Sequence, residues 1–185
     1  MTDTIIYEQP LNELIRACLR LEQLFQQVDH YRKDESIFGT RSLISVIINI
    51  LHLLDRPDLK VKLAKELSHQ TSLLLQLQNT PEIDQDKLNT LLHQLNDLVR
   101  CFIDSSGKIA QSVRDIELLN GLRLHLASPG GGCSFDIPVY HYWLSQDYAT
   151  RLSTIDSWLE EFSKIRLAAE LLLKLLREGT KVQTK

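Results

Sequence analysis

Long stretches of this chain place apolar residues alternately three and four positions apart. This spacing returns each side chain to one face of an α-helix, because a helix has about 3.6 residues per turn. The first such stretch runs through Leu11, Leu14, Cys18, Leu21, Phe25 and Val28. A helix with one apolar stripe has to cover that stripe with another element, so several such segments together indicate a bundle. The pattern therefore predicts an all-α fold, an antiparallel helix bundle.

Further helical segments bring the expected number of helices to about six or seven. A second helix is expected from about Arg41 to Leu54, apolar on several sides and therefore central in the bundle. A third starts at Pro57, which suits a first helical turn, with Asp55 in capping range, and continues to about Gln78. The remaining expected helices are one along Leu88, Leu91, Leu95, Leu98 and Phe102, one ending near Ala127, a short one capped by Asp136 with Pro138 in its first turn, and a last one along Ile155, Trp158, Phe162, Ile165, Ala169, Leu172 and Leu176.

The first ten residues follow a different pattern. Thr4 to Glu8 are typical of a short β-strand, and Pro10 ends it. An isolated strand cannot satisfy its backbone groups, so its partner is expected either in another copy of the chain or in sequence that would follow Lys185. The expected organisation is a strand over residues 1–10, a helical bundle domain over residues 11–178 and a frayed tail over residues 179–185.

Composition excludes several classes of protein. With 185 residues, of which 43% are hydrophobic and 24% charged, the chain is long and apolar enough for a globular core. A net charge of −3 without a basic block argues against a nucleic-acid binder. The chain has neither an unbroken apolar run of the roughly 18–20 residues that cross a bilayer nor the pattern of a signal peptide. Cys18, Cys101 and Cys133 are widely spaced and expected to be reduced, as in the cytoplasm.

Residues 128–143 differ from the rest of the chain. They contain three of its seven glycines, two of its five prolines, two of its five tyrosines and one of its two tryptophans. A connection between helices needs about 2–8 residues and no such composition. Consecutive glycines permit positive φ and the close approach of another segment, at a cost in conformational entropy. Function is therefore sought first in this loop.

Chemistry at this loop is one alternative. Cys133 and His141 form the only plausible pair of nucleophile and base, which leaves a thiol-dependent hydrolase or transferase as a possible function, against a small side chain in a tight loop. Asp136 is the nearest candidate for an orienting group. The glycines lack the lysine of a phosphate-binding loop, and the histidines lack the spacing of a helical zinc site. No cofactor or metal is expected.

Binding of a partner is the other alternative for the function of this region. Arg16 and Arg20 lie four residues apart on the outer face of the first helix, which suits either a solvated face or a patch that receives anions. Basic residues before the loop extend such a patch, and aromatic residues after it offer rigid contact area, although each aromatic also suits a core position. The expected partner-binding residues are Arg16, Arg20, Arg114, Arg123, His125, Tyr140, His141 and Trp143.

Two segments match one known family. The first is Tyr7-Glu8-Gln9-Pro10-Leu11-Asn12-Glu13, followed by Arg16 and Leu19-Arg20-Leu21-Glu22. The second is Ser128-Pro129-Gly130-Gly131-Gly132-Cys133-Ser134-Phe135-Asp136-Ile137-Pro138, with His141 and Trp143-Leu144. They lie more than a hundred residues apart and in the same order as in the ZapD cell-division proteins. The chain therefore resembles the ZapD family.

The resemblance implies a non-enzymatic cytoplasmic protein of the bacterial division ring at mid-cell. Family members bind the C-terminal tail of the tubulin-like GTPase FtsZ, form homodimers and cross-link FtsZ filaments into bundles during septation. They combine a helical domain with a small β-domain whose strands follow the last long helix. Since this chain stops at Lys185, most of that β-domain is expected to be missing, either because the sequence is shortened or because the protein is naturally short.

The resemblance also assigns binding residues by position. Arg20 and His141 match family positions, with Arg16 alongside. Arg114 matches an arginine in a more variable stretch, and Glu117 stands where relatives can have a second basic residue. The glycine loop is expected to turn tightly, so that His141 lies near Arg20.

Overall fold

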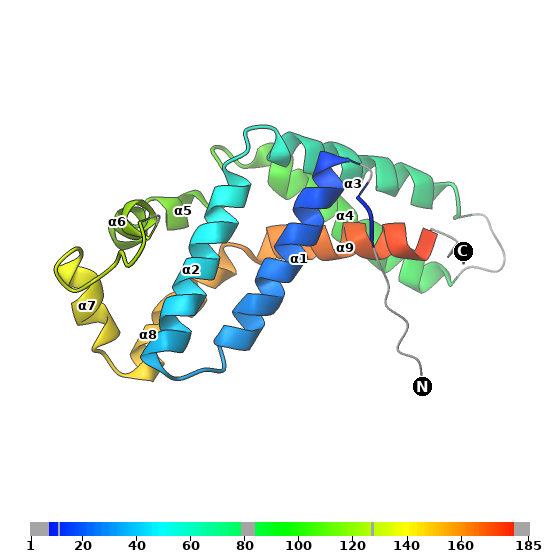
Figure 1. The fold of residues 1–185 in the computed structure, drawn as a ribbon. Helices are drawn as coiled ribbons and strands as arrows, with labels where there is room; N and C mark the ends of the chain where they lie inside the picture. The colour runs from blue at the N-terminus through cyan, green and yellow to red at the C-terminus, as the bar shows by residue number, and fades with distance from the viewer. Residues whose placement is uncertain (1–7, 11, 79–83, 127, 180–185) are drawn as a thin grey trace.

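The computed structural model describes residues 8–10, 12–78, 84–126 and 128–179, and these residues form helices joined by short connections (Figure 1). The helices are α1 Glu13–Tyr31, α2 Ile37–Leu54, α3 Leu59–Leu75, α4 Gln85–Asp104, α5 Gln111–Arg114, α6 Glu117–His125, α7 Pro138–Leu144, α8 Tyr148–Glu160 and α9 Ser163–Gly179. Within these ranges there is no strand, and the prediction of an all-α chain is confirmed.

Both ends of the expected organisation lie largely outside the described residues. The strand predicted for Thr4 to Glu8 has no support, since only Glu8 is described and it belongs to no regular element. Of the tail expected over residues 179–185, only Gly179 is described, and it is the last residue of α9.

Four helices begin at a side chain that accepts a hydrogen bond from the first turn. The side chains of Asn12, Ser36, Asp84 and Asp147 accept from backbone N–H groups three residues further on, at 2.9–3.2 Å. Such caps satisfy N–H groups that have no partner within the helix. The cap at Ser36 explains why α2 starts at Ile37, earlier than the expected start near Arg41.

The α2 helix is the centre of the core, as its sequence predicted. Its buried residues lie on several sides: Gly39, Thr40, Leu43, Ile44, Val46, Ile47, Ile48, Ile50, Leu51, Leu53 and Leu54. Within the described ranges it is the one helix long and apolar enough to span a bilayer by length and composition, and 56% of it is buried inside the protein. Burial in the bundle accounts for that composition.

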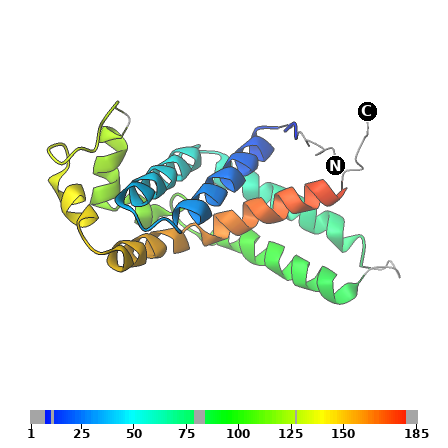
Figure 2. The same ribbon diagram turned by 60° about the horizontal axis from the view of Figure 1, so that its bottom comes forward.

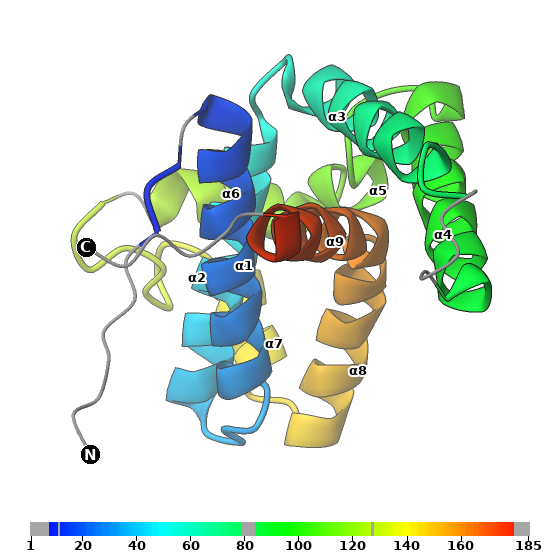
Figure 3. The ribbon, with the colours of Figure 1, turned by 90° about the vertical axis from the view of Figure 1, so that its right-hand side faces the viewer.

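The long helices form two layers that share α9. The α1 and α2 helices lie side by side, and α3 and α4 form a second pair that extends away from them. The α9 helix packs against α1 on one side and against α3 and α4 on the other (Figure 3). The short helices α5, α6 and α7 lie at the end of the molecule opposite to the pair α3 and α4 (Figure 2).

Two of the expected helices are broken in the structure. The last one divides into α8 and α9 at Glu161 and Phe162, and the two parts run in different directions (Figure 3). Phe162 is fully buried at the break, so the apolar seam continues although the helix does not. The helix expected to end near Ala127 divides into α5 and α6. No glycine or proline stands at either break, so local sequence carried no signal for them.

Candidate functional site

A hollow of about 420 Å³ lies between α1 and α2. Its lining consists of Arg20, Gln23, Leu24 and Gln27 from α1, and Asn49, His52, Leu53 and Arg56 from α2 and the turn after it. Arg20, His52 and Arg56 are exposed, and Leu53 is buried beneath them. No carboxylate of the described residues lines this hollow, which we call the cationic groove.

The arginines around the cationic groove differ in how they are paired. Among the described residues, no ion pair or hydrogen bond of the Arg20 side chain is found. Arg16 and Arg56 share the carboxylate of Glu13, at 2.5 Å and 3.3 Å. Two of the three guanidinium groups therefore share one carboxylate and the third has no ion pair among the described residues, so positive charge is in excess at this edge of α1.

Arg114 and Arg123 have a different role. Both pair with Asp55 at the C-terminal end of α2; Arg123 Nη2 lies 2.5 Å from Asp55 Oδ2. The Arg114 side chain is only 7% exposed, and its Nε donates to the carbonyl of Ile109 at 3.0 Å. The two ion pairs attach α5 and α6 to the end of α2, and Arg114 is not available at the surface.

Asp55 therefore does not cap the third helix. The N-cap of α3 is Asp58, which makes no side-chain capping bond. Burial by itself raises the pKa of Asp55, but the hydrogen bonds and positive charges of Arg114 and Arg123 outweigh burial and lower that pKa below its usual range. The carboxylate is ionised at neutral pH and neutralises part of the basic surface expected from sequence.

The glycine loop turns the chain tightly between α6 and α7. Gly130 and Gly132 have φ of 74° and 80°, which other residues rarely adopt. A Cβ on Gly131 would lie 1.8 Å from the backbone oxygen of half-buried His125, so only glycine fits there. The loop is thus folded against the end of its own preceding helix.

The aromatic residues of α7 are divided between the core and the surface. Tyr140 and Trp143 are buried, with ring centroids 6.3 Å apart, and Trp143 stacks on Trp158 of α8 at 5.9 Å. Trp143 attaches α7 to α8, and Tyr140 packs on Trp143, so both residues have the core role left open by the sequence. His141 is exposed, and so is Tyr142, at 70%.

The structure does not bring His141 close to Arg20. The N-terminal part of α2 contacts the glycine loop, because Arg41 donates to the carbonyl of Gly132 at 3.4 Å and lies over the Tyr140 ring at 5.8 Å. Arg20 faces the other end of α2, about 12–16 Å further along at 1.5 Å per residue. Figures 1 and 2 show α7 and α1 on opposite sides of α2.

Cys133 lacks the partners of a catalytic thiol. Its Sγ lies 2.9 Å from the carbonyl oxygen of Gly130, and its N–H donates to Asp136 at 3.2 Å. Asp136 is therefore engaged with Cys133 and does not cap α7, which begins at Pro138 as expected. No hydrogen bond joins Cys133 to His141 among the described residues, which also contain no group of three or more potential metal ligands.

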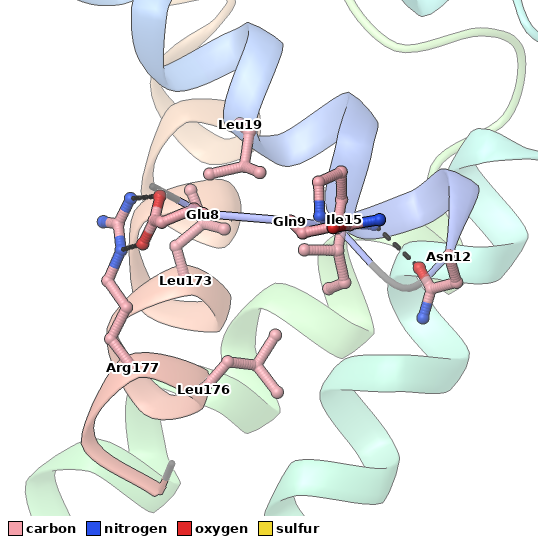
Figure 4. A pocket seen from close by; sticks show the side chains of 9 residues that line it. Glu8, Gln9, Asn12, Ile15, Leu19, Leu173, Leu176 and Arg177 are labelled. Atoms are coloured by element: carbon pink, nitrogen blue, oxygen red, sulfur yellow. Dashed lines mark hydrogen bonds and ion pairs between the residues drawn. The ribbon is translucent and has the colours of Figure 1, made fainter. Parts of the chain in front are cut away.

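A second hollow, of about 330 Å³, separates residues 8–10 from α1 and α9 (Figure 4). Its walls are mainly apolar, with Ile15, Leu19 and Leu173 among them. The one guanidinium in its lining, that of Arg177, pairs with Glu8 at 2.6 Å and with Glu22 at 2.7 Å. The positive charge of Arg177 in this hollow is therefore compensated by two carboxylates.

Comparison with known proteins places the chain in a family. The sequence model of the family described as cell division protein ZapD matches residues 19–185. Proteins named cell division protein ZapD match at 38% identity in Coxiella burnetii, over 97% of this chain and 70% of the relative, and at 40% in Azoarcus sp., over 95% and 70%. The chain belongs to the ZapD family.

Membership in the ZapD family confirms the resemblance seen in the two sequence segments and assigns the chain a role in cell division. The matched relatives are longer than this chain, which spans about 70% of their length. Neither the family nor the geometry at Cys133 favours a thiol-dependent enzyme.

Three residues near the expected site were missed from sequence: Arg41, His52 and Arg56. A signal for two of them was present. Asn49, His52 and Arg56 are spaced as one helical face and interrupt an otherwise apolar segment, which marks the exposed side of α2. That Arg20 would lie against this face depended on the packing of α1 on α2.

Proposed function

We propose that this ZapD-family protein binds the C-terminal tail of FtsZ and, as a cytoplasmic homodimer at the mid-cell division ring, cross-links FtsZ filaments into bundles. The observation that supports this most is the cationic groove, in which Arg20 is exposed without a carboxylate partner among the described residues. An arginine in that state is suited to a carboxylate of an incoming peptide, because guanidinium groups bind carboxylates with two parallel hydrogen bonds.

The predicted binding residues take different parts in this proposal. Arg20 contacts the tail directly, and Arg16 lies one turn away on the same face of α1. The exposed His141 is a separate contact point at the other end of α2. Four residues support the surface, since each contacts a neighbouring helix: Arg114, Arg123, Tyr140 and Trp143. No contact within the described part of the chain assigns a part to the side chain of His125.

A homodimer would present two cationic grooves. Two weak contacts gain from effective concentration when neighbouring filaments are engaged together. Because the contacts at the groove are exposed charges, salt screens them over about 8–10 Å at physiological ionic strength. Bundling of FtsZ filaments should therefore weaken as salt is raised.

The test is co-sedimentation with FtsZ polymers, together with titration of a fluorescent FtsZ tail peptide. Arg20→Glu should weaken peptide binding about tenfold or more, since a charge is reversed at the contact. Arg100→Glu is the matched control, because Arg100 is exposed on α4, away from the groove. Deletion of the FtsZ tail should remove binding. Equal binding by Arg20→Glu and Arg100→Glu would refute the proposed groove.

A further inference from the structure

Glu13 places a carboxylate of the protein itself at the edge of the cationic groove. Its Oε1 lies 2.5 Å from Arg16 Nη1, and its Oε2 lies 3.3 Å from Arg56 Nη1. Arg56 is part of the groove lining. One carboxylate therefore joins two guanidinium groups from different elements, which is the contact that an acidic side chain of a bound peptide would make.

This contact lies at the surface of the protein. The side chains of Glu13, Arg16 and Arg56 are 60%, 46% and 40% exposed. Exposed ion pairs are weak, because water and salt screen them and long side chains lose freedom in forming them. Glu13 can therefore be displaced by a competing carboxylate without disturbing the core.

We propose that Glu13 is an internal competitor of the acidic partner peptide, an inference that rests on the proposed function. In the free protein it neutralises Arg16 and Arg56, and of these three arginines Arg20 is the one with no ion pair among the described residues. The peptide meets Arg20 first. A second peptide carboxylate then exchanges with Glu13 and reaches Arg16 and Arg56. This exchange lowers the affinity for peptides with a single acidic residue and favours peptides with two.

A purely local role for Glu13 has to be separated from this one. Glu13 is the first residue of α1, where an acidic side chain also favours the positive end of the helix dipole. If Glu13 acts only on the helix dipole, removing its charge changes thermal stability and leaves peptide affinity unchanged. Competition has the opposite signature, since removing the charge strengthens peptide binding.

The decisive variant is Glu13→Gln, with Glu160→Gln as its control. Glu160 is exposed at the end of α8, and no ion pair of its side chain is found in the described part of the chain, so both variants lose one negative charge. With a fluorescent FtsZ tail peptide at low salt, Glu13→Gln should bind about two- to fivefold more tightly than the wild type. Glu160→Gln should bind like the wild type. Equal affinity of the two variants would overturn the inference.

A double-mutant cycle with Arg56→Gln tests the exchange itself. If the gain from Glu13→Gln comes from freeing Arg56, it should shrink when Arg56 is already neutral. A gain that persists at full size in the double variant would overturn the exchange. If Glu13→Gln leaves peptide affinity unchanged while Arg20→Glu weakens it, this inference alone is refuted. If Arg20→Glu also leaves peptide affinity unchanged, the proposed function is refuted.

Discussion

Replacement of Asp55 by asparagine should lower the free energy of unfolding by about 2–3 kcal/mol. Breaking a buried ion pair costs about 3–5 kcal/mol, because the remaining charge stays buried without its partner. Arg114 meets this description at 7% exposure, but the Asp55 side chain is 35% exposed, so water reduces the loss. Arg114 also keeps its bond to the carbonyl of Ile109.

Chemical denaturation and thermal unfolding measure the effect. For a chain of this length, 1 kcal/mol corresponds to about 2–4 °C, so Tm should fall by about 4–12 °C. Asp97→Asn removes the same charge from the exposed face of α4 and should change stability by no more than about 0.5 kcal/mol.

The effect has a defined dependence on pH. Because the pKa of Asp55 is lowered in the folded protein, its contribution is complete above the pKa of an unfolded aspartate, about 4. That contribution is lost as the pH falls through the lowered pKa. The difference between wild type and Asp55→Asn should therefore be constant near neutral pH and shrink below about pH 4. A difference that grows on acidification, or an Asp55→Asn as stable as Asp97→Asn, would refute the reasoning.

Two further pairs of variants test the glycine loop and α7 by thermal unfolding. Gly131→Ala should cost about 1–3 kcal/mol, because its Cβ would collide with the carbonyl of His125. Gly121→Ala in α6 meets nothing and should stabilise by about 0.5–1 kcal/mol; equal effects of the two alanines would contradict the steric account. Trp143→Ala should cost about 3–5 kcal/mol. Exposed Tyr142→Ala should change stability by about 0.5 kcal/mol at most, and similar losses would show that the stack on α8 is unimportant.

Local pattern was sufficient for the long helices α1 to α4 and most of the core, but not for the breaks between α5 and α6 and between α8 and α9. The expected seam of α1 is buried at Leu14, Cys18, Leu21, Phe25 and Val28, while Leu11 lies outside the described residues. This works because a helix repeats every 3.6 residues and burial of apolar surface is the main driving force of folding. The family could also be recognised from two short segments, because each is specific in residue type and spacing.

What the sequence determined by itself was the all-α class, the central place of α2 and the family. The site depended on tertiary structure. Arg114 and Arg123 looked like surface cations, but they lie 59 and 68 residues from the Asp55 that neutralises them. Arg20 acquired His52 and Arg56 as neighbours only when α1 packed on α2. Charges act through space, so the chain's order shows which residues are cationic but not which of them remain unpaired.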